Sequence, residues 1–200
     1  MEKQKLLERL ASQGFASYIL NAFKKVPREN FIPEQYKRCA YDDIALPLNE
    51  ENATISQPTT IAFMLSLLEL HNKRKQKILE IGSGQGYVLA LLAEITNGEI
   101  YGIEINKNLT ERARSMLVRY KNIYVFNKNG FHGLPEKAPF DRILISAAAK
   151  TIPKHLMPQL KENGLLVTPV DRSIIQLKKH KKSIEAHEFR GFVFVSLQGE

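Results

Sequence analysis

The stretch Lys77-Ile78-Leu79-Glu80-Ile81-Gly82-Ser83-Gly84-Gln85-Gly86 decides the fold of this chain. A short apolar run that carries one acid stops at three alternating glycines, and an apolar pattern with helical period follows. This order predicts a strand, a tight turn and a helix. Glycines in such a turn let the backbone approach a ligand closely, and the helix after them offers free N–H groups and the positive end of its dipole.

A second strand-like run over residues 99–104 begins about one helix later and ends in Glu104. In a parallel sheet Glu104 then lies at the carboxyl end of the neighbouring strand, where an acid can accept hydrogen bonds from ribose hydroxyls. The three glycines have the spacing G-x-G-x-G, and dinucleotide-binding proteins have G-x-G-x-x-G. With Glu80 before them and Glu104 after them, they resemble the S-adenosylmethionine site of Rossmann-like methyltransferases. A glycine turn in an ordinary βαβ unit is the plainer alternative.

The composition is that of one compact domain with a small appendage, because 44% of the 200 residues are hydrophobic. No apolar run approaches the roughly eighteen residues of a membrane span, and the charged start Met1-Glu2-Lys3-Gln4-Lys5 is unlike a secretory signal. The single cysteine, Cys39, excludes an internal disulfide and a zinc site built on cysteines. We therefore expect a cytoplasmic protein with no metal ion and no membrane partner.

The chain is basic, with a formal net charge of +8. This charge suits either a nucleic-acid partner or acidic substrates attracted at long range. The densest basic run is Lys178-Lys179-His180-Lys181-Lys182, between two strand-like runs late in the chain. Such runs are usually solvated turns, and a hairpin tip is the interpretation we favour.

Strand and helix patterns alternate from Lys77 onward, which predicts an α/β fold with a mainly parallel seven-stranded sheet and helices on both faces. Strands are expected near residues 77–81, 99–104, 122–126, 140–146, 163–170, 172–178 and 189–197, and helices near 85–96, 107–119 and 152–161. Asn163-Gly164 is expected to cap the last helix. The two strands around the basic run suggest an antiparallel edge.

Residues 1–75 are expected to form a helical N-terminal extension, attached to a cofactor-binding core of residues 76–200. Helical patterns cover residues 3–10 and 17–24. Residues 26–33 contain two prolines and are expected to be ordered but not helical.

Two stretches connect this extension to the core. Asn49-Glu50-Glu51-Asn52 is polar and expected to be an exposed loop. Thr54-Ile55-Ser56-Gln57-Pro58 begins a helix, with Ser56 or Gln57 at the cap and Pro58 in the first turn. The buried face of that helix is expected to consist of Ile61, Met64, Leu65 and Leu68.

Several segments are more specific than these patterns. Before the glycine turn they are Val26-Pro27-Arg28-Glu29-Asn30-Phe31-Ile32-Pro33, Ala40-Tyr41-Asp42-Asp43 and Ala53-Thr54-Ile55-Ser56-Gln57-Pro58. After it they are Ala138-Pro139-Phe140-Asp141, Ala147-Ala148-Ala149, Pro153 with Leu156, Gln159-Leu160-Lys161 and residues 164–170. In this order, from about Val26 to Gly199, the chain resembles the protein-L-isoaspartate (D-aspartate) O-methyltransferases.

The resemblance implies a repair enzyme that uses S-adenosylmethionine and releases S-adenosylhomocysteine. Members of the family methylate the free α-carboxylate of isoaspartyl residues in damaged proteins and peptides. The methyl ester then closes to a succinimide, which reopens partly to normal aspartate. The resemblance also implies a Rossmann-like class I methyltransferase fold with a helical N-terminal region that helps to cover the substrate. A monomer without a nucleic-acid partner is expected.

The residues present agree with this chemistry. A carboxylate with a pKa of roughly 3.3–3.7 is ionised at neutral pH, so its attack on a sulfonium methyl needs no general base. Catalysis then comes from positioning and from the removal of water. The resemblance assigns the hydroxyl of Ser56 to orienting the carboxylate, with assistance from Thr54. The alternative for Ser56 is a plain helix cap.

The resemblance also assigns the cofactor site. The residues expected at the methionine end are Glu80, Gly82, Ser83 and Gly84, in the turn that Gly86 completes; Glu104 is expected at the ribose, and Ile105, Asn129 and Gly130 at the adenine. Where the family has Gly-Asp-Gly, this chain has Lys128-Asn129-Gly130. An asparagine side chain can accept a hydrogen bond from the adenine amino group but carries no charge. We therefore expect weaker cofactor binding.

Other departures from the family bear on the substrate. The loop Asn49-Glu50-Glu51-Asn52 lacks the family's glycine and brings two acids towards a site for an anion, although an exposed loop screens them. Asp171 stands where Pro-Val-Gly is usual, and Ser196 replaces a proline. The alternative is therefore a diverged member that methylates another carboxylate, or that binds the cofactor or a peptide without turnover. Acceptance of D-aspartyl residues is left open by the sequence.

A nucleic-acid methyltransferase fits less well. Amino-adenine enzymes usually carry an Asn/Asp-Pro-Pro-aromatic box after the fourth strand, where this chain has Ile145-Ser146-Ala147-Ala148. Cytosine-C5 enzymes need a Pro-Cys nucleophile, and Cys39 follows Arg38 far from the predicted sheet. The glycine spacing disfavours an NAD-dependent oxidoreductase.

Overall fold

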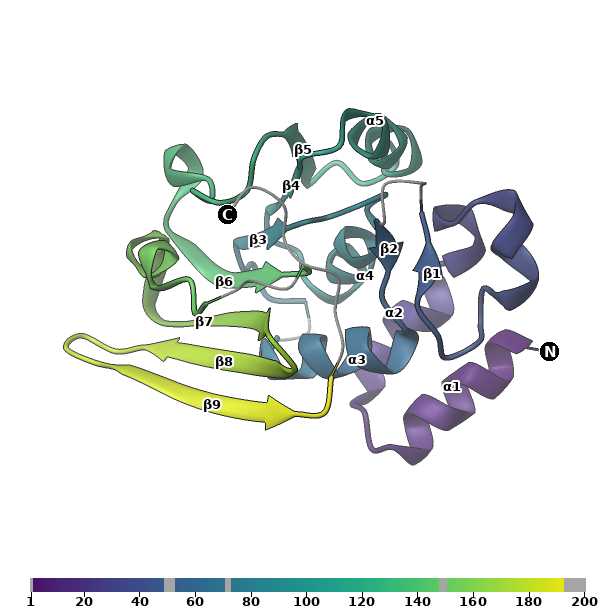
Figure 1. Cartoon of the computed structure of the whole chain (residues 1–200), viewed down its shortest axis with the longest axis horizontal. Helices are drawn as coiled ribbons and strands as arrows, with labels where there is room; N and C mark the ends of the chain where they lie inside the picture. Colours follow the sequence, from purple (N-terminus) through teal and green to yellow (C-terminus); the bar gives the residue numbers. More distant parts are fainter. Residues whose placement is uncertain (1, 49–52, 71–72, 148–150, 193–200) are drawn as a thin grey trace.

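The computed structural model describes residues 2–48, 53–70, 73–147 and 151–192 of the chain. A seven-stranded sheet has the strand order β5-β4-β3-β6-β7-β8-β9 (Figure 1). Its strands are β3 (Ile78–Ile81), β4 (Ile100–Glu104), β5 (Ile123–Asn127), β6 (Phe140–Ile145), β7 (Leu160–Val170), β8 (Ser173–Lys179) and β9 (Ile184–Arg190). The predicted α/β fold is confirmed.

The five strands from β5 to β7 are parallel, as predicted. Every residue of β3 and β4 is buried, which explains the near-continuous apolar runs of these strands. In the sheet register Ile81 pairs with Ile103 of β4 and with Ile145 of β6. The carboxyl ends of β3, β4 and β6 therefore meet at one edge of the sheet, where open α/β sheets bind their ligands.

The remaining strands, β8 and β9, continue the sheet in antiparallel pairing, as the basic run between them suggested. The strand expected over residues 189–197 begins earlier, because β9 pairs with β8 from Ile184 to Arg190. Most of β9 is exposed and polar at this edge of the sheet, so it lacks the apolar pattern of a buried strand. Residues 193–197, which include Ser196, lie outside the described residues.

The helix expected over residues 152–161 is wrong in type and extent. The segment η4 (Lys154–Gln159) is a 3-10 helix that contains Pro158, whose missing N–H prevents a regular α-helix. Leu160 already pairs with Phe140 in the sheet. Asn163 and Gly164 consequently lie inside β7 and cap no helix. The extra residues of β7 are absorbed by a register shift before Leu165 pairs with Arg142.

The N-terminal part is mainly helical, as predicted. Its elements are α1 (Glu2–Ser12), α2 (Ser17–Lys25), the 3-10 helices η1 (Arg28–Phe31) and η2 (Glu34–Cys39), the strands β1 (Leu46–Pro47) and β2 (Thr54–Ile55), and α3 (Pro58–Leu67). The segment expected to be non-helical over residues 26–33 thus contains one 3-10 turn between its prolines. The antiparallel pair of β1 and β2 was not predicted.

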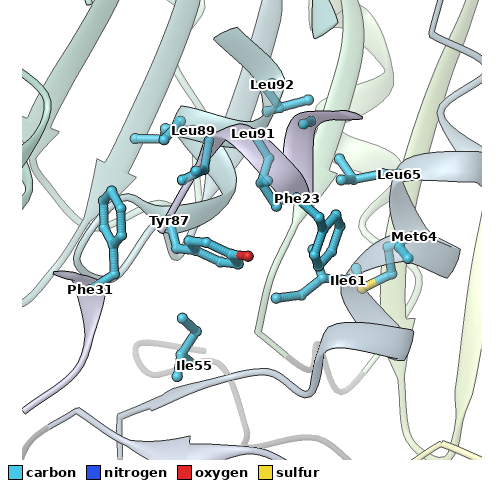
Figure 2. Packing of buried hydrophobic residues seen from close by; sticks show 14 of the residues in the cluster. Phe23, Phe31, Ile55, Ile61, Met64, Leu65, Tyr87, Leu89, Leu91 and Leu92 are labelled. Carbon is cyan, nitrogen blue, oxygen red and sulfur yellow. The ribbon is translucent and has the colours of Figure 1, made fainter. Parts of the chain in front are cut away.

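One hydrophobic cluster joins this part to the sheet. Phe23 of α2, Met64 and Leu65 of α3 and Tyr87 of α4 (Tyr87–Ile95) lie close together (Figure 2). The predicted buried face of α3 is confirmed, because Ile61, Met64, Leu65 and Leu68 are all buried. Residues of α5 (Lys107–Met116) belong to the same cluster. The N-terminal helices are therefore held against the core by shared apolar packing.

The opposite face of the sheet carries a second cluster, which includes Phe140 and Ile143 of β6. Leu156 and Met157 of η4 cover part of this face, and Leu134 precedes the short 3-10 helix η3 (Pro135–Lys137). All five α-helices contribute to the first cluster, whereas among the described residues only 3-10 helices contribute to this one, so the expected cover of both faces is met here by 3-10 turns. In the described part of the chain, no helix is long and apolar enough to cross a membrane.

Candidate active site

A cavity opens at the carboxyl ends of β3 and β6, with an empty volume of about 540 Å³ including its mouth. The glycine turn after β3 forms one wall, and the N-terminal segment with β2 and α3 forms the other. The lining residues are Phe31, Leu48, Thr54, Ile55, Ser56, Ile61, Met64, Glu80, Gly82, Ser83, Gly84, Gln85, Tyr87, Val88, Leu144 and Ser146. Segments far apart in the sequence therefore build one site.

The glycine turn has a backbone that other residues rarely adopt. Gly82, Gly84 and Gly86 have φ values of 79°, 54° and 88°, in the left-handed region that favours glycine. Gly86 is the cap residue of α4, so the turn delivers the amino end of that helix to the cavity. A Cβ on Gly84 would lie 3.2 Å from Cδ1 of Leu48, which shows how closely the N-terminal segment approaches the turn.

Glu104 holds the turn against β4. The backbone N–H of Gly84 donates to Oε2 of Glu104 at 2.8 Å, and the backbone N–H of Asn106 donates to Oε1 at 2.9 Å. Each carboxylate oxygen has further lone pairs, so Glu104 can still accept hydrogen bonds from a ligand.

Glu80 is buried at the base of the cavity. The hydroxyl of Ser146 donates to Oε1 of Glu80 at 2.7 Å, and Oε2 has no hydrogen-bond partner among the described residues. Burial raises the pKa of the Glu80 carboxyl to about 8, and the nearby charge of Glu104 adds to this shift, while the hydrogen bond from Ser146 opposes it. A cationic or hydrogen-bond-donating group of a ligand could therefore pair with Oε2 of Glu80.

Two further buried polar atoms also lack a hydrogen-bond partner. Oγ of Ser83 and Nε2 of Gln85 have no hydrogen-bond partner within the described ranges, and both residues line the cavity. Buried polar groups in native proteins are nearly always hydrogen-bonded. Together with Glu80 they form a polar inner wall that offers both acceptors and donors to a ligand.

Ser56 and Thr54 line the cavity from the opposite side. Thr54 is exposed in β2, and Ser56 is partly buried between β2 and α3. Of the two residues expected at the cap of α3, Gln57 holds the cap position, but its side chain makes no cap hydrogen bond. Pro58 does occupy the first turn of α3, as predicted.

Asp43 caps α3 from a distant part of the chain. Its Oδ1 accepts from the backbone N–H of Thr59 at 2.8 Å, and its Oδ2 accepts from the Thr59 hydroxyl at 2.7 Å. These bonds fix the start of the helix next to Ser56. The hydroxyl of Ser56 is therefore not required for the cap.

Aromatic side chains form the apolar end of the cavity. Tyr87 is buried between Phe31 and Phe23 (Figure 2), with ring centroids 5.5 Å and 6.1 Å away, respectively. The guanidinium of Arg28 lies 5.4 Å from the centroid of the Tyr87 ring. Burial lowers the pKa of Arg28 to about 10, so this group keeps its positive charge at neutral pH.

The three residues assigned to the adenine lie beyond the cavity, at the ends of β4 and β5. Ile105 is 47% exposed. Asn129 is exposed, and its Oδ1 accepts from the backbone N–H of Phe131 at 2.9 Å. Gly130 approaches β3 so closely that a Cβ would lie 2.4 Å from Cγ2 of Ile81. These residues form an open shelf beside the glycine turn.

The structure thus brings Thr54, Ser56, Glu80, Gly82, Ser83 and Gly84 together in one cavity, with Gly86 at the end of the same turn and Glu104 hydrogen-bonded to Gly84. Ser146 and Gln85 also line the cavity and were not predicted as site residues. Ser146 follows β6 at the same sheet edge as Glu80, and that position was the available signal. The loop over residues 49–52 and the segment Ala148-Ala149 lie outside the described residues.

The parallel sheet, the glycine turn and the acid at the end of β4 define a Rossmann-like class I methyltransferase. The family model described as protein-L-isoaspartate (D-aspartate) O-methyltransferase (PCMT) matches residues 1–200. The chain belongs to this family.

Individual relatives agree with the family match. A protein-L-isoaspartate O-methyltransferase from Methanococcoides burtonii is 39% identical over 203 residues, covering 98% of each chain. One from Dictyoglomus thermophilum is 38% identical over 206 residues, covering 100% of this chain and 92% of the relative. A solved protein-L-isoaspartate O-methyltransferase superimposes with a TM-score of 0.88 at 26% identity, covering 98% of this chain and 66% of that chain.

A second solved structure bears on the cofactor. It is a Plasmodium falciparum protein of the same description, in complex with S-adenosyl-L-homocysteine. It has a TM-score of 0.80 and 26% identity, covering 97% of each chain.

The inner wall fits S-adenosylmethionine. The methionine end of this molecule carries an ammonium and a carboxylate group, and the wall offers the unpaired oxygen of Glu80 and the unpaired amide nitrogen of Gln85. The amino end of α4 adds a positive potential at the same place. The donor and acceptor types therefore match the ligand.

Proposed function

We propose that this chain transfers a methyl group from S-adenosylmethionine to the free carboxylate of isoaspartyl residues in damaged proteins and peptides, and so initiates their repair. The observation that carries the proposal is the shared cavity, in which Ser56 and Thr54 face the glycine turn and Glu80. A methyl donor held by one wall then meets an acceptor held by the other. The product esters would close to succinimides and reopen partly to aspartate.

The two walls have different tasks. Glu80, Gly82, Ser83, Gly84 and Gly86 would hold the methionine end of the cofactor, and Glu104 would accept hydrogen bonds from its ribose. Ile105, Asn129 and Gly130 would flank the adenine. When bound, S-adenosylmethionine supplies a methyl group activated by its sulfonium charge.

The substrate carboxylate needs orientation and dehydration. The Ser56 hydroxyl donates a hydrogen bond to one carboxylate oxygen, which leaves the other free to act as the nucleophile, and Thr54 assists at the mouth. Apolar side chains such as Leu48 and Ile55 exclude water from the reacting atoms. No proton has to be removed, since the carboxylate is ionised at neutral pH.

The two parts of the chain would accordingly have different roles. Residues 1–75 would cover the substrate, and residues 76–200 would bind the cofactor. We infer a monomer in the cytoplasm that acts on isoaspartyl proteins and peptides and has no nucleic-acid partner. This inference rests on Cys39 as the single cysteine and on the family resemblance.

Replacement of Ser56 by alanine tests the proposal. A hydrogen bond to a charged group contributes about 1.5–3 kcal/mol, so kcat/KM for an isoaspartyl peptide should fall roughly ten- to a hundred-fold in Ser56→Ala. Binding of S-adenosylhomocysteine should not change. Ser66→Ala is the matched control, because the Ser66 hydroxyl donates to the backbone carbonyl of Phe63 within α3. Unchanged kcat/KM in Ser56→Ala would refute the role of the serine.

A further inference from the structure

A second, larger groove lies between η4 and the β8–β9 hairpin, with an empty volume of about 1390 Å³ including open solvent. Lys178 of the hairpin pairs with Leu165, which pairs with Arg142 near the start of β6. The proposed active site lies past the other end of β6, at Ser146. The hairpin therefore extends at the end of the sheet opposite to the cavity (Figure 1).

The groove is strongly positive. Its lining includes the lysines Lys154, Lys179, Lys181 and Lys182 and no aspartate or glutamate, and the nearby Glu185 pairs with the ring of His180 at 3.2 Å. The ammonium of Lys179 is fixed by hydrogen bonds to the backbone carbonyls of Met157 at 2.9 Å and Leu160 at 2.6 Å. Lys154, Lys181 and Lys182 are exposed around it. The ammonium of Lys179 is thus held in place at the groove. The exposed side chains of the other three lysines can adjust to a ligand.

The rest of the lining is largely apolar. Met157 belongs to η4 and Ile152 precedes it, Leu177 belongs to β8, and Ile184 and Ala186 belong to β9. Ile184 is 43% exposed, which is unusual for a large aliphatic side chain. An apolar centre with a charged rim is the usual anatomy of a protein-binding surface.

These residue types favour a polypeptide over a nucleic acid. Sites for single-stranded nucleic acids combine positive charge with aromatic platforms for the bases, and base readout uses arginine, lysine and amide side chains. The lining of this groove contains no phenylalanine, tyrosine or tryptophan platform, no arginine and no side-chain amide. Its apolar centre matches leucine or isoleucine side chains, and its lysines match glutamate and aspartate.

We propose that this basic groove, defined by Lys154, Lys179, Lys181, Lys182 and Ile184, docks an acidic, leucine-rich segment of the damaged protein whose isoaspartyl residue is methylated. The link to methylation rests on the proposed function, whereas the binding itself does not. Docking at a distance raises the effective concentration of the damaged residue at the active site.

The path between the two sites sets the length of a test substrate. From Arg142 to Ser146 the sheet extends about 13 Å, the hairpin beyond Lys178 adds about 10 Å to reach Lys181, and two strand spacings from β6 to β8 add about 10 Å across the sheet. The straight separation is thus about 25 Å, and a flexible linker of about twenty residues has a root-mean-square span of that length. An isoaspartyl peptide joined through such a linker to an acidic, leucine-rich tail can occupy both sites.

Fluorescence anisotropy with a labelled glutamate–leucine peptide tests the binding. The triple variant Lys154→Glu, Lys181→Glu, Lys182→Glu should bind it at least about ten-fold more weakly than the unmodified chain. The control Lys24→Glu, Lys75→Glu, Lys121→Glu changes the net charge equally with residues outside the groove and should bind as the unmodified chain does. A glutamine–leucine peptide should not bind.

Either of two results would overturn the docking proposal. One is equal binding by both triple variants, which would indicate a non-specific effect of net charge. The other is tighter binding of an oligothymidylate than of the acidic peptide, with loss in the groove variant, which would indicate a nucleic-acid site.

Kinetics with the tethered substrate then test the link to methylation. The acidic tail should lower KM at least several-fold relative to a neutral tail, without a change in kcat, and this difference should vanish in the groove variant. Equal KM values for both tails would overturn the docking role. Failure to methylate any isoaspartyl peptide, tethered or not, would instead refute the proposed function while leaving the anisotropy result intact.

Discussion

Replacement of Glu80 by glutamine should separate the charge of this buried carboxyl from its hydrogen bonds. Without a ligand, burial raises the pKa of Glu80 from its ordinary value of 4.5 to about 8. An ammonium group of the cofactor placed against Oε2 would favour the ionised form, so binding should release a proton. Glutamine keeps the shape and an acceptor oxygen but removes the proton linkage.

The size of the effect follows from the pKa. The ionised, binding-competent fraction of Glu80 is about 1% at pH 6 and about half at pH 8, so affinity for S-adenosylhomocysteine should rise about 50-fold between these pH values. In Glu80→Gln the affinity should be nearly independent of pH over this range. The variant should bind about as weakly at pH 8 as the unmodified chain does at pH 6.

The same pKa predicts how stability changes without ligand. The folded chain keeps the Glu80 proton up to about pH 8, whereas the unfolded chain loses it near pH 4.5. A raised carboxyl pKa therefore stabilises the fold at low pH, and this contribution is lost as pH rises towards 8. At pH 7 the loss is about 3 kcal/mol, and Glu80→Gln should avoid it.

Isothermal titration calorimetry measures the linkage directly. Titrations at pH 7 in two buffers of different ionisation enthalpy should show release of about one proton by the unmodified chain and none by Glu80→Gln. Equal affinities at pH 6 and pH 8 for the unmodified chain, with no proton release, would refute the assignment of Glu80 to the cofactor. Urea unfolding of both proteins across the same range checks the stability prediction.

Substitutions at three other positions test separate features. Asn129→Asp restores a charge at the adenine shelf and should tighten S-adenosylhomocysteine binding about three- to ten-fold by calorimetry; weaker binding would contradict its place there. Asp171 has a φ of 52°, so Asp171→Gly should raise the free energy of unfolding by about 0.5–1 kcal/mol in urea, whereas Asp171→Ala should not. Gly130→Ala places a Cβ 2.4 Å from Cγ2 of Ile81 and should lower that free energy by about 1–3 kcal/mol; an unchanged value would disprove the close contact.

The central βαβ unit could be predicted because its signals are local. The apolar run before Gly82, the glycine spacing and the acid at Glu104 each act within a few residues of the chain. Strand direction then follows from right-handed βαβ connections, which bring Glu80 and Glu104 to one sheet edge. The glycine turn, Glu80 and Glu104 could therefore be predicted from the sequence to lie together at one edge of the sheet.

Other features depend on contacts between distant segments. The cap of α3 comes from Asp43, sixteen residues before Thr59, and no local pattern indicates it. The pair of β1 and β2 has only two residues in each strand, too few for a period of two to be recognised. Pairing of Leu160 with Phe140 overrides the helical pattern before it.

Methylation of matched peptides by the unmodified chain is the sharpest test of the proposed repair activity. Labelled S-adenosylmethionine is offered with three peptides of one sequence that differ only in an isoaspartyl, an L-aspartyl or a D-aspartyl residue. The proposed function predicts base-labile label in the isoaspartyl peptide and none in the L-aspartyl peptide, and the third peptide decides whether D-aspartyl residues are accepted. Binding of S-adenosylhomocysteine with no label in the isoaspartyl peptide, or equal label in the isoaspartyl and L-aspartyl peptides, would contradict it.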